Sequence, residues 1–177
     1  MTDGRIQPKR KSLRMSGYDY TLDTDYFITL CTYNKRHIFG EIENSVFVPR
    51  QNSPDKIISN YLEKLSGKFE NLIVENYVIM PNHIHIILSN PGTYNEITLE
   101  HSGTHISTVM QWFKTQTTNE YIKGVRAGLF PPFEKHLWQR GYYEHVITSR
   151  RDYDNCSDYI NLNPLKWSSD EYYGKIL

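Results

Sequence analysis

Residues 71–88 constrain the fold of this chain most strongly, because they contain two strand-like runs that flank a two-residue turn. The first run covers residues 71–80, Pro81-Asn82 favours a turn, and the second run begins at His83. Residues two apart in a strand point to the same face of the sheet. We therefore expect His83 and His85 to lie side by side on one strand of a hairpin.

The flanking segments predict three helices, two further strands and a small hairpin. Ser53 is a candidate N-cap before Pro54, and Ser149 is a candidate N-cap for the last helix, which Pro164 should end. In chain order we expect a strand at 26–33, a small hairpin at 39–48, a helix from 53 to about 67, the strands at 71–80 and 83–88, a loop at 91–103, a helix at 104–121, a strand at 138–147 and a helix at 149–163.

The main elements have the order β-α-β-β-α-β, followed by one more helix. This order is typical of an α+β, ferredoxin-like fold, in which helices cover one face of an antiparallel sheet. A chain of 177 residues can form one such domain, which we predict at 17–177. No apolar run approaches the roughly 20 residues of a membrane span, and Cys31 and Cys156 lack metal-type spacing, so we expect a cytoplasmic protein.

The formal net charge is zero, but the N-terminal residues are basic. Residues 1–16 therefore predict a flexible basic arm that could follow a phosphate backbone, and a solvated tail explains the same pattern equally well. The basic residues of this arm that we consider as DNA contacts are Arg10, Lys11 and Arg14.

The last helix adds two candidates to the histidine pair. Tyr159 and Asn163 are four residues apart and share one face of a helix. An amide oxygen can bind a hard cation, and a phenol can act as a covalent nucleophile. Each pattern alone also has a purely structural explanation: packed histidines for His83 and His85, a packed ring for Tyr159, and a helix C-cap for Asn163.

Three motifs together resemble the REP-associated tyrosine transposases, which are relatives of the single-tyrosine HUH transposases of small insertion sequences. The motifs are Met80-Pro-Asn-His-Ile-His85, Leu137-Trp-Gln-Arg-Gly-Tyr-Tyr-Glu-His145 and Tyr159-Ile-Asn-Leu-Asn-Pro164. They occur in the order seen in that family, and the resemblance extends over residues 9–167.

The resemblance implies a ferredoxin-like HUH nuclease fold that binds Mg²⁺ or Mn²⁺ through His83 and His85. It implies that Tyr159 is the nucleophile and that the third ligand comes four residues later, at Asn163, where the insertion-sequence enzymes have Gln. Single-stranded DNA or hairpins from palindromic repeats would be the substrate. Relatives act as monomers or as homodimers, and the resemblance does not decide between them.

The middle motif supplies further candidate DNA contacts: Arg140, Tyr142, Tyr143 and His145. Arg140 could bind a phosphate, and the two tyrosines could stack on bases or pack in the core. The two tyrosines are also rival nucleophiles, which we rank below Tyr159 because neither is paired with a ligand at helical spacing. His145 could contact phosphate, assist proton transfer or support the structure.

These features predict a metal-dependent endonuclease and strand transferase that cleaves single-stranded DNA through a 5′-phosphotyrosine intermediate. A DNA-hairpin-binding regulatory protein without catalytic activity is the alternative. A metal enzyme for small molecules is a third reading, and it would need a carboxylate such as Glu75 or Glu144 beside the histidines.

Overall fold

The computed structural model describes residues 24–50, 52–90, 93–95, 100–102 and 104–173. The predicted arm at 1–16, with Arg10, Lys11 and Arg14, lies outside these residues and stays a prediction, as does the extent of the domain at 17–177.

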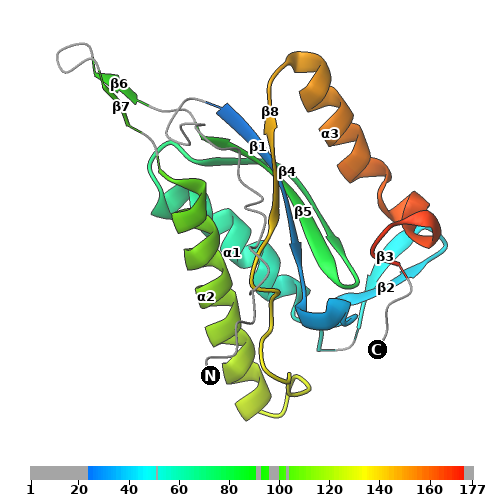
Figure 1. The fold of residues 1–177 in the computed structure, drawn as a ribbon. Coiled ribbons are helices and arrows are strands. Elements are labelled where there is room, and N and C mark those ends of the chain that lie inside the picture. Colours follow the sequence, from blue (N-terminus) through cyan, green and yellow to red (C-terminus); the bar gives the residue numbers. More distant parts are fainter. Residues whose placement is uncertain (1–23, 51, 91–92, 96–99, 103, 174–177) are drawn as a thin grey trace, which may run out of the picture.

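A four-stranded antiparallel sheet forms the centre of the molecule (Figure 1). Its strands are β1 (Thr24–Cys31), β4 (Ile73–Met80), β5 (His83–Asn90) and β8 (Tyr143–Ile147), in the spatial order β4-β5-β1-β8. β4 and β5 form the predicted hairpin, in which Met80 pairs with His83. β1 lies between β5 and β8 and is antiparallel to both. The α+β fold with an antiparallel sheet is therefore confirmed.

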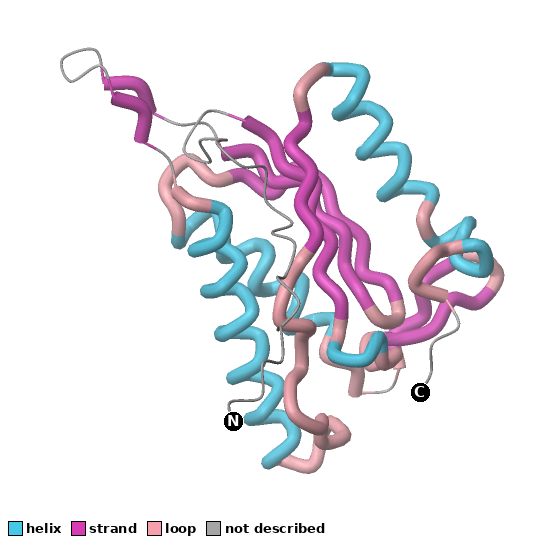
Figure 2. Tube along the Cα trace, viewed as in Figure 1, coloured by secondary structure: helices cyan, strands magenta, loops and turns pink. Residues whose placement is uncertain are grey.

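The helices lie on both faces of this sheet, as Figure 2 also shows. α1 (Asp55–Lys68) and α2 (Ile106–Arg126) pack against each other on one face, and α3 (Arg150–Leu162) packs against β4 and β5 on the other face. Two helices on one face match the expected β-α-β-β-α-β unit, and the additional helix closes the opposite side. Within the described part of the chain, no helix combines the length and the apolar composition that a membrane crossing requires.

Shorter elements complete the described structure. They are the 3₁₀ helices η1 (Tyr33–Lys35) and η2 (Pro164–Ser169), the hairpin β2 (Gly40–Glu43) and β3 (Val46–Pro49), and the paired short strands β6 (Thr93–Asn95) and β7 (Glu100–Ser102). The hairpin predicted at 39–48 is confirmed, whereas part of the loop expected at 91–103 forms strands.

Several boundaries differ from the sequence predictions, and three of the differences have a structural cause. The N-cap of α1 is Pro54 and not Ser53, whose hydroxyl donates to the Phe39 carbonyl and still accepts from the Asp55 N–H at 3.4 Å. α2 continues to Arg126, since Tyr121 at the predicted end and Gly124 nearly one turn beyond it are both buried. The strand predicted from residue 138 begins only at Tyr143, because the preceding segment leaves the sheet after one isolated bridge between Thr32 and Trp138.

Side-chain alternation divides the interior into two clusters. The larger one buries Tyr26, Ile28, Ile84 and Ile86 against α1 and α2. The smaller one contains Phe27, Ile87, Ile147 and Ile160 and lies between the sheet and α3. His83 and His85 have odd numbers like Ile87, so the alternation along β5 places both on the α3 face.

Candidate metal and nucleophile site

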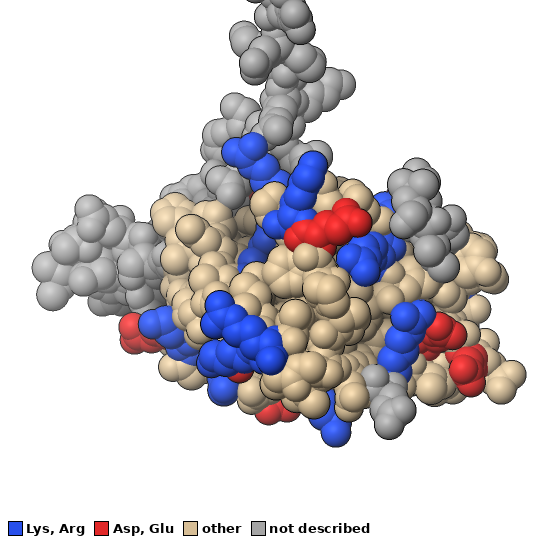
Figure 3. Space-filling view, turned by 90° about the horizontal axis from the view of Figure 1, so that it is seen from below, with Lys and Arg blue, Asp and Glu red and all other residues tan. Residues whose placement is uncertain are grey.

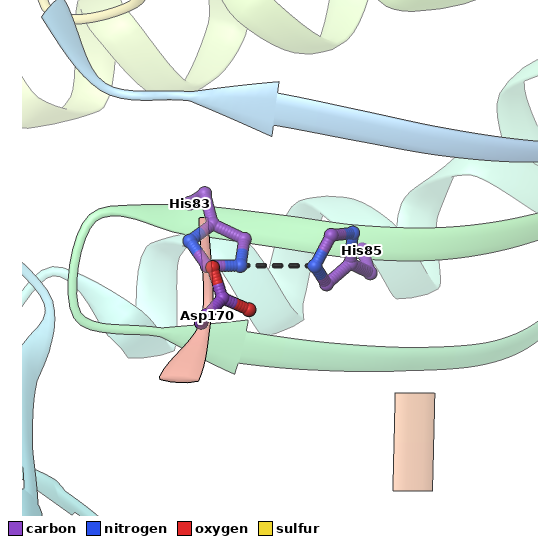
Figure 4. A group of neighbouring side chains, drawn as sticks. All are labelled: His83, His85 and Asp170. Atoms are coloured by element: carbon purple, nitrogen blue, oxygen red, sulfur yellow. Dashed lines mark hydrogen bonds between the residues drawn. The ribbon is translucent and has the colours of Figure 1, made fainter. Parts of the chain in front are cut away.

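His83 and His85 point toward each other from the start of β5. Their Nε2 atoms are 2.9 Å apart, and both side chains are almost completely buried. Figure 4 shows the two rings with the Asp170 carboxylate beside them. The strand alternation that the sequence predicts therefore produces a pair of converging ring nitrogens.

Asn82 fixes the tautomer of His83. The Asn82 amide Nδ2 donates to the carbonyls of Lys35, at 3.1 Å, and Tyr172, at 3.0 Å, so its Oδ1 is the atom that accepts a hydrogen bond from His83 Nδ1, at 2.8 Å. A histidine that donates through Nδ1 and is neutral keeps a lone pair on Nε2. Burial lowers the pKa of His83 well below its usual range, and His85 adds to this effect.

Thr29 holds His85 from the neighbouring strand β1. Thr29 is paired with His85 in the sheet, and its Oγ1 lies 2.8 Å from His85 Nδ1. Burial lowers the pKa of His85 to about 3, so this ring is also neutral at physiological pH. Because a hydroxyl can donate or accept, Thr29 can accommodate either neutral tautomer of His85.

Asp170 brings a carboxylate oxygen to this pair, and Asn163 is hydrogen-bonded to Asp170. A carboxylate oxygen of Asp170, which follows η2, lies within 4.8 Å of ring nitrogens of both histidines. Asn163, at the end of α3, is 2 % exposed and donates through Nδ2 to Asp170 Oδ2 at 3.1 Å. Its Oδ1 is buried without a hydrogen-bond partner among the described residues. A buried amide oxygen of this kind is an available ligand atom.

Tyr159 lies directly beside the histidine pair. Its ring centroid is 5.1 Å from that of His85 and 5.8 Å from that of Phe27, in edge-to-face contacts. The side chain is nonetheless 38 % exposed, so a ligand can reach it. Burial of the phenol raises the pKa of Tyr159 to about 12, and the carboxylates of Asp170 and Glu171 act in the same direction. Attack by this oxygen therefore requires that its proton be removed or its charge be stabilised.

A pocket of about 380 Å³ opens between α3 and the sheet at this point. Its lining residues include His85, Tyr143, His145, Tyr159 and Tyr172. Tyr172 also covers His83, with a centroid distance of 4.5 Å. The pocket therefore joins Tyr159 and the histidine pair to the predicted contacts on β8.

The four candidates of the middle motif lie on different sides of the sheet. Tyr143, which is 51 % exposed, and His145 line the pocket with Tyr159. Tyr142 packs against the larger core, and Arg140 lies beside Lys114, whose ammonium group donates to the Arg140 carbonyl at 2.9 Å. The structure therefore brings only two of the four to the site.

A second groove runs along α2, on the face of the sheet opposite α3. It contains cationic and polar side chains from α2 and from the segment before β8, namely Lys114, Thr115, Thr118, Asn119, Lys135, His136, Gln139 and Arg140. Figure 3 shows Lys and Arg side chains spread over the lower face of the molecule, with a few acidic residues among them.

Thr29, Asn82 and Asp170 belong to the site although the sequence analysis did not select them. Thr29 follows from the strand pairing, and Asn82 immediately precedes the histidines, so these two could have been found by asking which neighbours orient the rings. Asp170 lies beyond Pro164 in an irregular segment, and no periodic pattern indicates its position.

The residues at this site fit a divalent metal ion. Two cis ligands on an octahedral ion, each about 2.1 Å from it, are about 3 Å apart, and the two Nε2 atoms are 2.9 Å apart. Two neutral imidazoles and a carboxylate converge here, and the unpaired amide oxygen of Asn163, whose nitrogen donates to that carboxylate, is a further candidate ligand.

Comparison with known proteins identifies the family to which the chain is similar. The family model described as "Transposase IS200 like" matches residues 22–163. The chain is 31% identical over 173 residues to an uncharacterised protein of Haemophilus influenzae, with 93% of both chains covered. It is 29% identical over 93 residues to the REP-associated tyrosine transposase of Escherichia coli, an alignment that covers 52% of this chain and 44% of that protein.

A solved structure of a REP-associated tyrosine transposase bound to a REP hairpin has a similar fold. The TM-score is 0.56 at 22% identity, and the match covers 86% of this chain and 74% of that one.

Proposed function

Because this chain belongs to the family of IS200-like transposases, we propose that it is a metal-dependent endonuclease and strand transferase for single-stranded DNA. Tyr159 is the nucleophile in this proposal. The observation that carries it is the contact between the Tyr159 ring and His85, which puts a partly exposed phenol next to two buried, neutral imidazoles.

His83, His85 and Asn163 would hold the ion, and Mg²⁺ or Mn²⁺ suits the oxygen ligands. Asp170 is a further ligand candidate, because its carboxylate lies near both rings and accepts a hydrogen bond from Asn163. When bound, the ion polarises a phosphoryl oxygen and stabilises the negative charge that develops during attack.

Tyr159 supplies the covalent step. Its oxygen forms a bond to phosphorus, the bond from phosphorus to the 3′-oxygen breaks, and the product is a 5′-phosphotyrosine and a free 3′-hydroxyl. The phenol proton passes to solvent and the leaving 3′-oxygen takes up a proton from solvent, which the partial exposure of Tyr159 allows. Attack of a 3′-hydroxyl on the phosphotyrosine reverses these bond changes and rejoins a strand.

DNA hairpins of repetitive palindromic elements are the proposed substrate. The solved structure with a similar fold is titled as a complex with a REP hairpin. In this chain the groove with Lys114, Lys135 and Arg140 offers cations for a phosphate backbone. Arg10, Lys11 and Arg14 of the predicted arm would add further backbone contacts. The site pocket and this groove lie on different sides of the sheet, so one could hold a single strand while the other contacts the hairpin.

A single copy of the chain can provide the complete site. Tyr159 and His85 meet within one chain, so no exchange of α3 between two protomers is needed to bring them together. We therefore propose that the tyrosine acts in cis, which is compatible with a monomer as well as a homodimer.

The test is formation of a covalent protein–DNA adduct on hairpin oligonucleotides with labelled single-stranded flanks, in the presence of Mg²⁺ or Mn²⁺. Wild-type protein should give a band on a denaturing gel that Tyr159→Phe abolishes while hairpin binding remains. Tyr142→Phe is the matched control, since Tyr142 packs on the other side of the sheet and should leave the adduct unchanged. An adduct in Tyr159→Phe would exclude Tyr159 as the nucleophile. Binding without any wild-type adduct would favour a hairpin-binding regulatory protein instead.

A further inference from the structure

The pocket at Tyr159 extends along α3 well beyond the histidine pair. His145 on β8 lines it together with Tyr159, and Asp152 on α3 is hydrogen-bonded to His145. Asp152, which does not line the pocket itself, precedes Tyr159 by seven residues, which correspond to about 10 Å along a helix. His145 is therefore held by the part of α3 about two turns before Tyr159, where a nucleotide attached to the reacting phosphate can lie.

His145 is held in place by a carboxylate. Its Nε2 lies 3.0 Å from each Asp152 carboxylate oxygen. These are the two hydrogen bonds of the His145 ring among the described residues. The backbone N–H of Thr148 donates to Asp152 Oδ2 at 3.0 Å, so the carboxylate is itself fixed. The His145 side chain is still 40 % exposed. Because Nε2 is bonded to Asp152, a ligand meets Nδ1, which donates a hydrogen bond when the ring carries a proton on both nitrogens.

The charges in the pocket differ between its two ends. Asp170 and Glu171 lie near the histidine pair and Tyr172, which suits a cation. His145 lies at the other end, with Asn155 and Cys156 in the lining, and its partner Asp152 is the acidic side chain there. When His145 carries a proton on both nitrogens, its charge offsets that of Asp152, so a phosphate at this end meets a hydrogen-bond donor and not an unpaired carboxylate.

Helix capping alone explains only part of this arrangement. Ser149 Oγ accepts from the Asp152 N–H at 3.2 Å, and the Asp152 carboxylate accepts from Thr148, so Asp152 has a role at the start of α3. That role does not require an exposed histidine. His145 opposes Phe27 in the sheet, and Phe27 stacks on His85 at 5.3 Å, so one packed ring connects His145 to the metal-site histidine.

We propose that this pocket holds the nucleotide next to the scissile phosphate, with His145 donating to the phosphate of that nucleotide and Asp152 positioning His145. The proposal rests on the function proposed above and specifies how the single strand is held at the same site.

The experiment is a chemical double-mutant cycle between His145 and one phosphate. A hairpin oligonucleotide with randomised single-stranded flanks first identifies the cleaved bond from the sequences that become attached to the wild-type protein. Methylphosphonate, which is neutral, then replaces each phosphate next to the scissile one in turn. At one position the wild-type rate of adduct formation at low substrate concentration should fall by about 10- to 100-fold, the range of a hydrogen bond to a charged group.

In His145→Gln the unmodified DNA should react more slowly, and methylphosphonate at that position should have little further effect. Asp152→Asn should likewise reduce the methylphosphonate penalty, whereas Asp154→Asn should keep the full wild-type penalty, because Asp154 pairs with Arg150 on the exposed side of α3. A loss of structure alone would slow both DNA substrates equally. Thermal unfolding of each variant checks the fold independently.

Equal methylphosphonate penalties in the wild type, His145→Gln and Asp152→Asn would overturn the inference while the proposed function stands. If the wild type forms no adduct on any oligonucleotide, the proposed function and this inference fall together.

Discussion

The same two strands bury apolar residues on one face of the sheet and polar residues on the other. Toward α1 and α2, β1 and β5 present side chains such as Ile28 and Ile86, which are fully buried. Toward α3, the adjacent positions are Thr29 and His85, which are just as completely buried and bond to each other. Burial of polar groups is unfavourable unless they are hydrogen-bonded, so we expect the α3 face, which holds the proposed site, to contribute less to stability.

The size of the two cores agrees with this division of roles. The cluster under α1 and α2 is large and continuous, whereas the α3 side has a small apolar cluster around Phe27 and Ile160 next to the histidine pair. We therefore expect substitutions on the first face to lower stability, and substitutions on the second to lower activity. The predictions below test that separation in order of decreasing effect.

The largest effect is expected for His85→Ala on the α3 face. Loss of one imidazole should reduce metal-dependent adduct formation by roughly 10²- to 10⁴-fold, because a Lewis acid supplies several kcal/mol of transition-state stabilisation. Removal of the metal with EDTA should have a comparable effect on the wild type. The rate of adduct formation in the presence of Mn²⁺ measures the loss of activity, and the exposed His105→Ala is the control. Full activity of His85→Ala would remove the metal site from the proposal.

Phe113→Ala should have the largest effect on the other face. Phe113 is fully buried on α2, and loss of such a ring lowers the free energy of unfolding by about 3–5 kcal/mol. Urea unfolding measures the loss, and the fraction that remains folded should form adducts at the wild-type rate. A variant of normal stability but without activity would contradict the separation of the two faces.

Thr29→Val should weaken metal binding while it changes stability less than Phe113→Ala does. The substitution keeps the shape of the side chain but removes the oxygen that lies 2.8 Å from His85 Nδ1. Loss of a partner that orients a ligand typically lowers metal affinity by about 10- to 100-fold. Titration of the protein with Mn²⁺ measures the affinity, with the exposed Thr108→Val as control. An unchanged affinity would show that the ring does not need this partner.

Ser149→Ala should have the smallest effect. Its hydroxyl caps α3 by accepting from the Asp152 N–H, and loss of such a cap lowers the free energy of unfolding by about 1 kcal/mol. Thermal unfolding measures the change against Ser66→Ala, an exposed position inside α1. If both variants unfold at the same temperature, α3 is held by its packing on Ile160 and not by its cap.

Much of the fold could be predicted because it depends on local patterns. The alternation in β5 and the proline-containing turn before it determine the β4–β5 hairpin, and Ser149 caps α3 as predicted. The errors occur where a distant partner competes with the local signal. Ser53 is drawn toward the Phe39 carbonyl, so α1 starts one residue later than predicted although Ser53 still accepts from the Asp55 N–H. The segment before β8 bonds to Thr32 and Lys114 and does not continue the strand.

The sequence by itself determined that His83 and His85 share one face of a strand and that Tyr159 and Asn163 share one face of a helix, because both follow from the repeat of a single element. Only the tertiary structure decided that these faces meet. Burial of Ile160 against Phe27 and Ile87 places α3 on the histidine side of the sheet, and the chain after Pro164 then brings Asp170 to the rings. No local pattern encodes these contacts, since they depend on packing between residues that lie far apart in the chain.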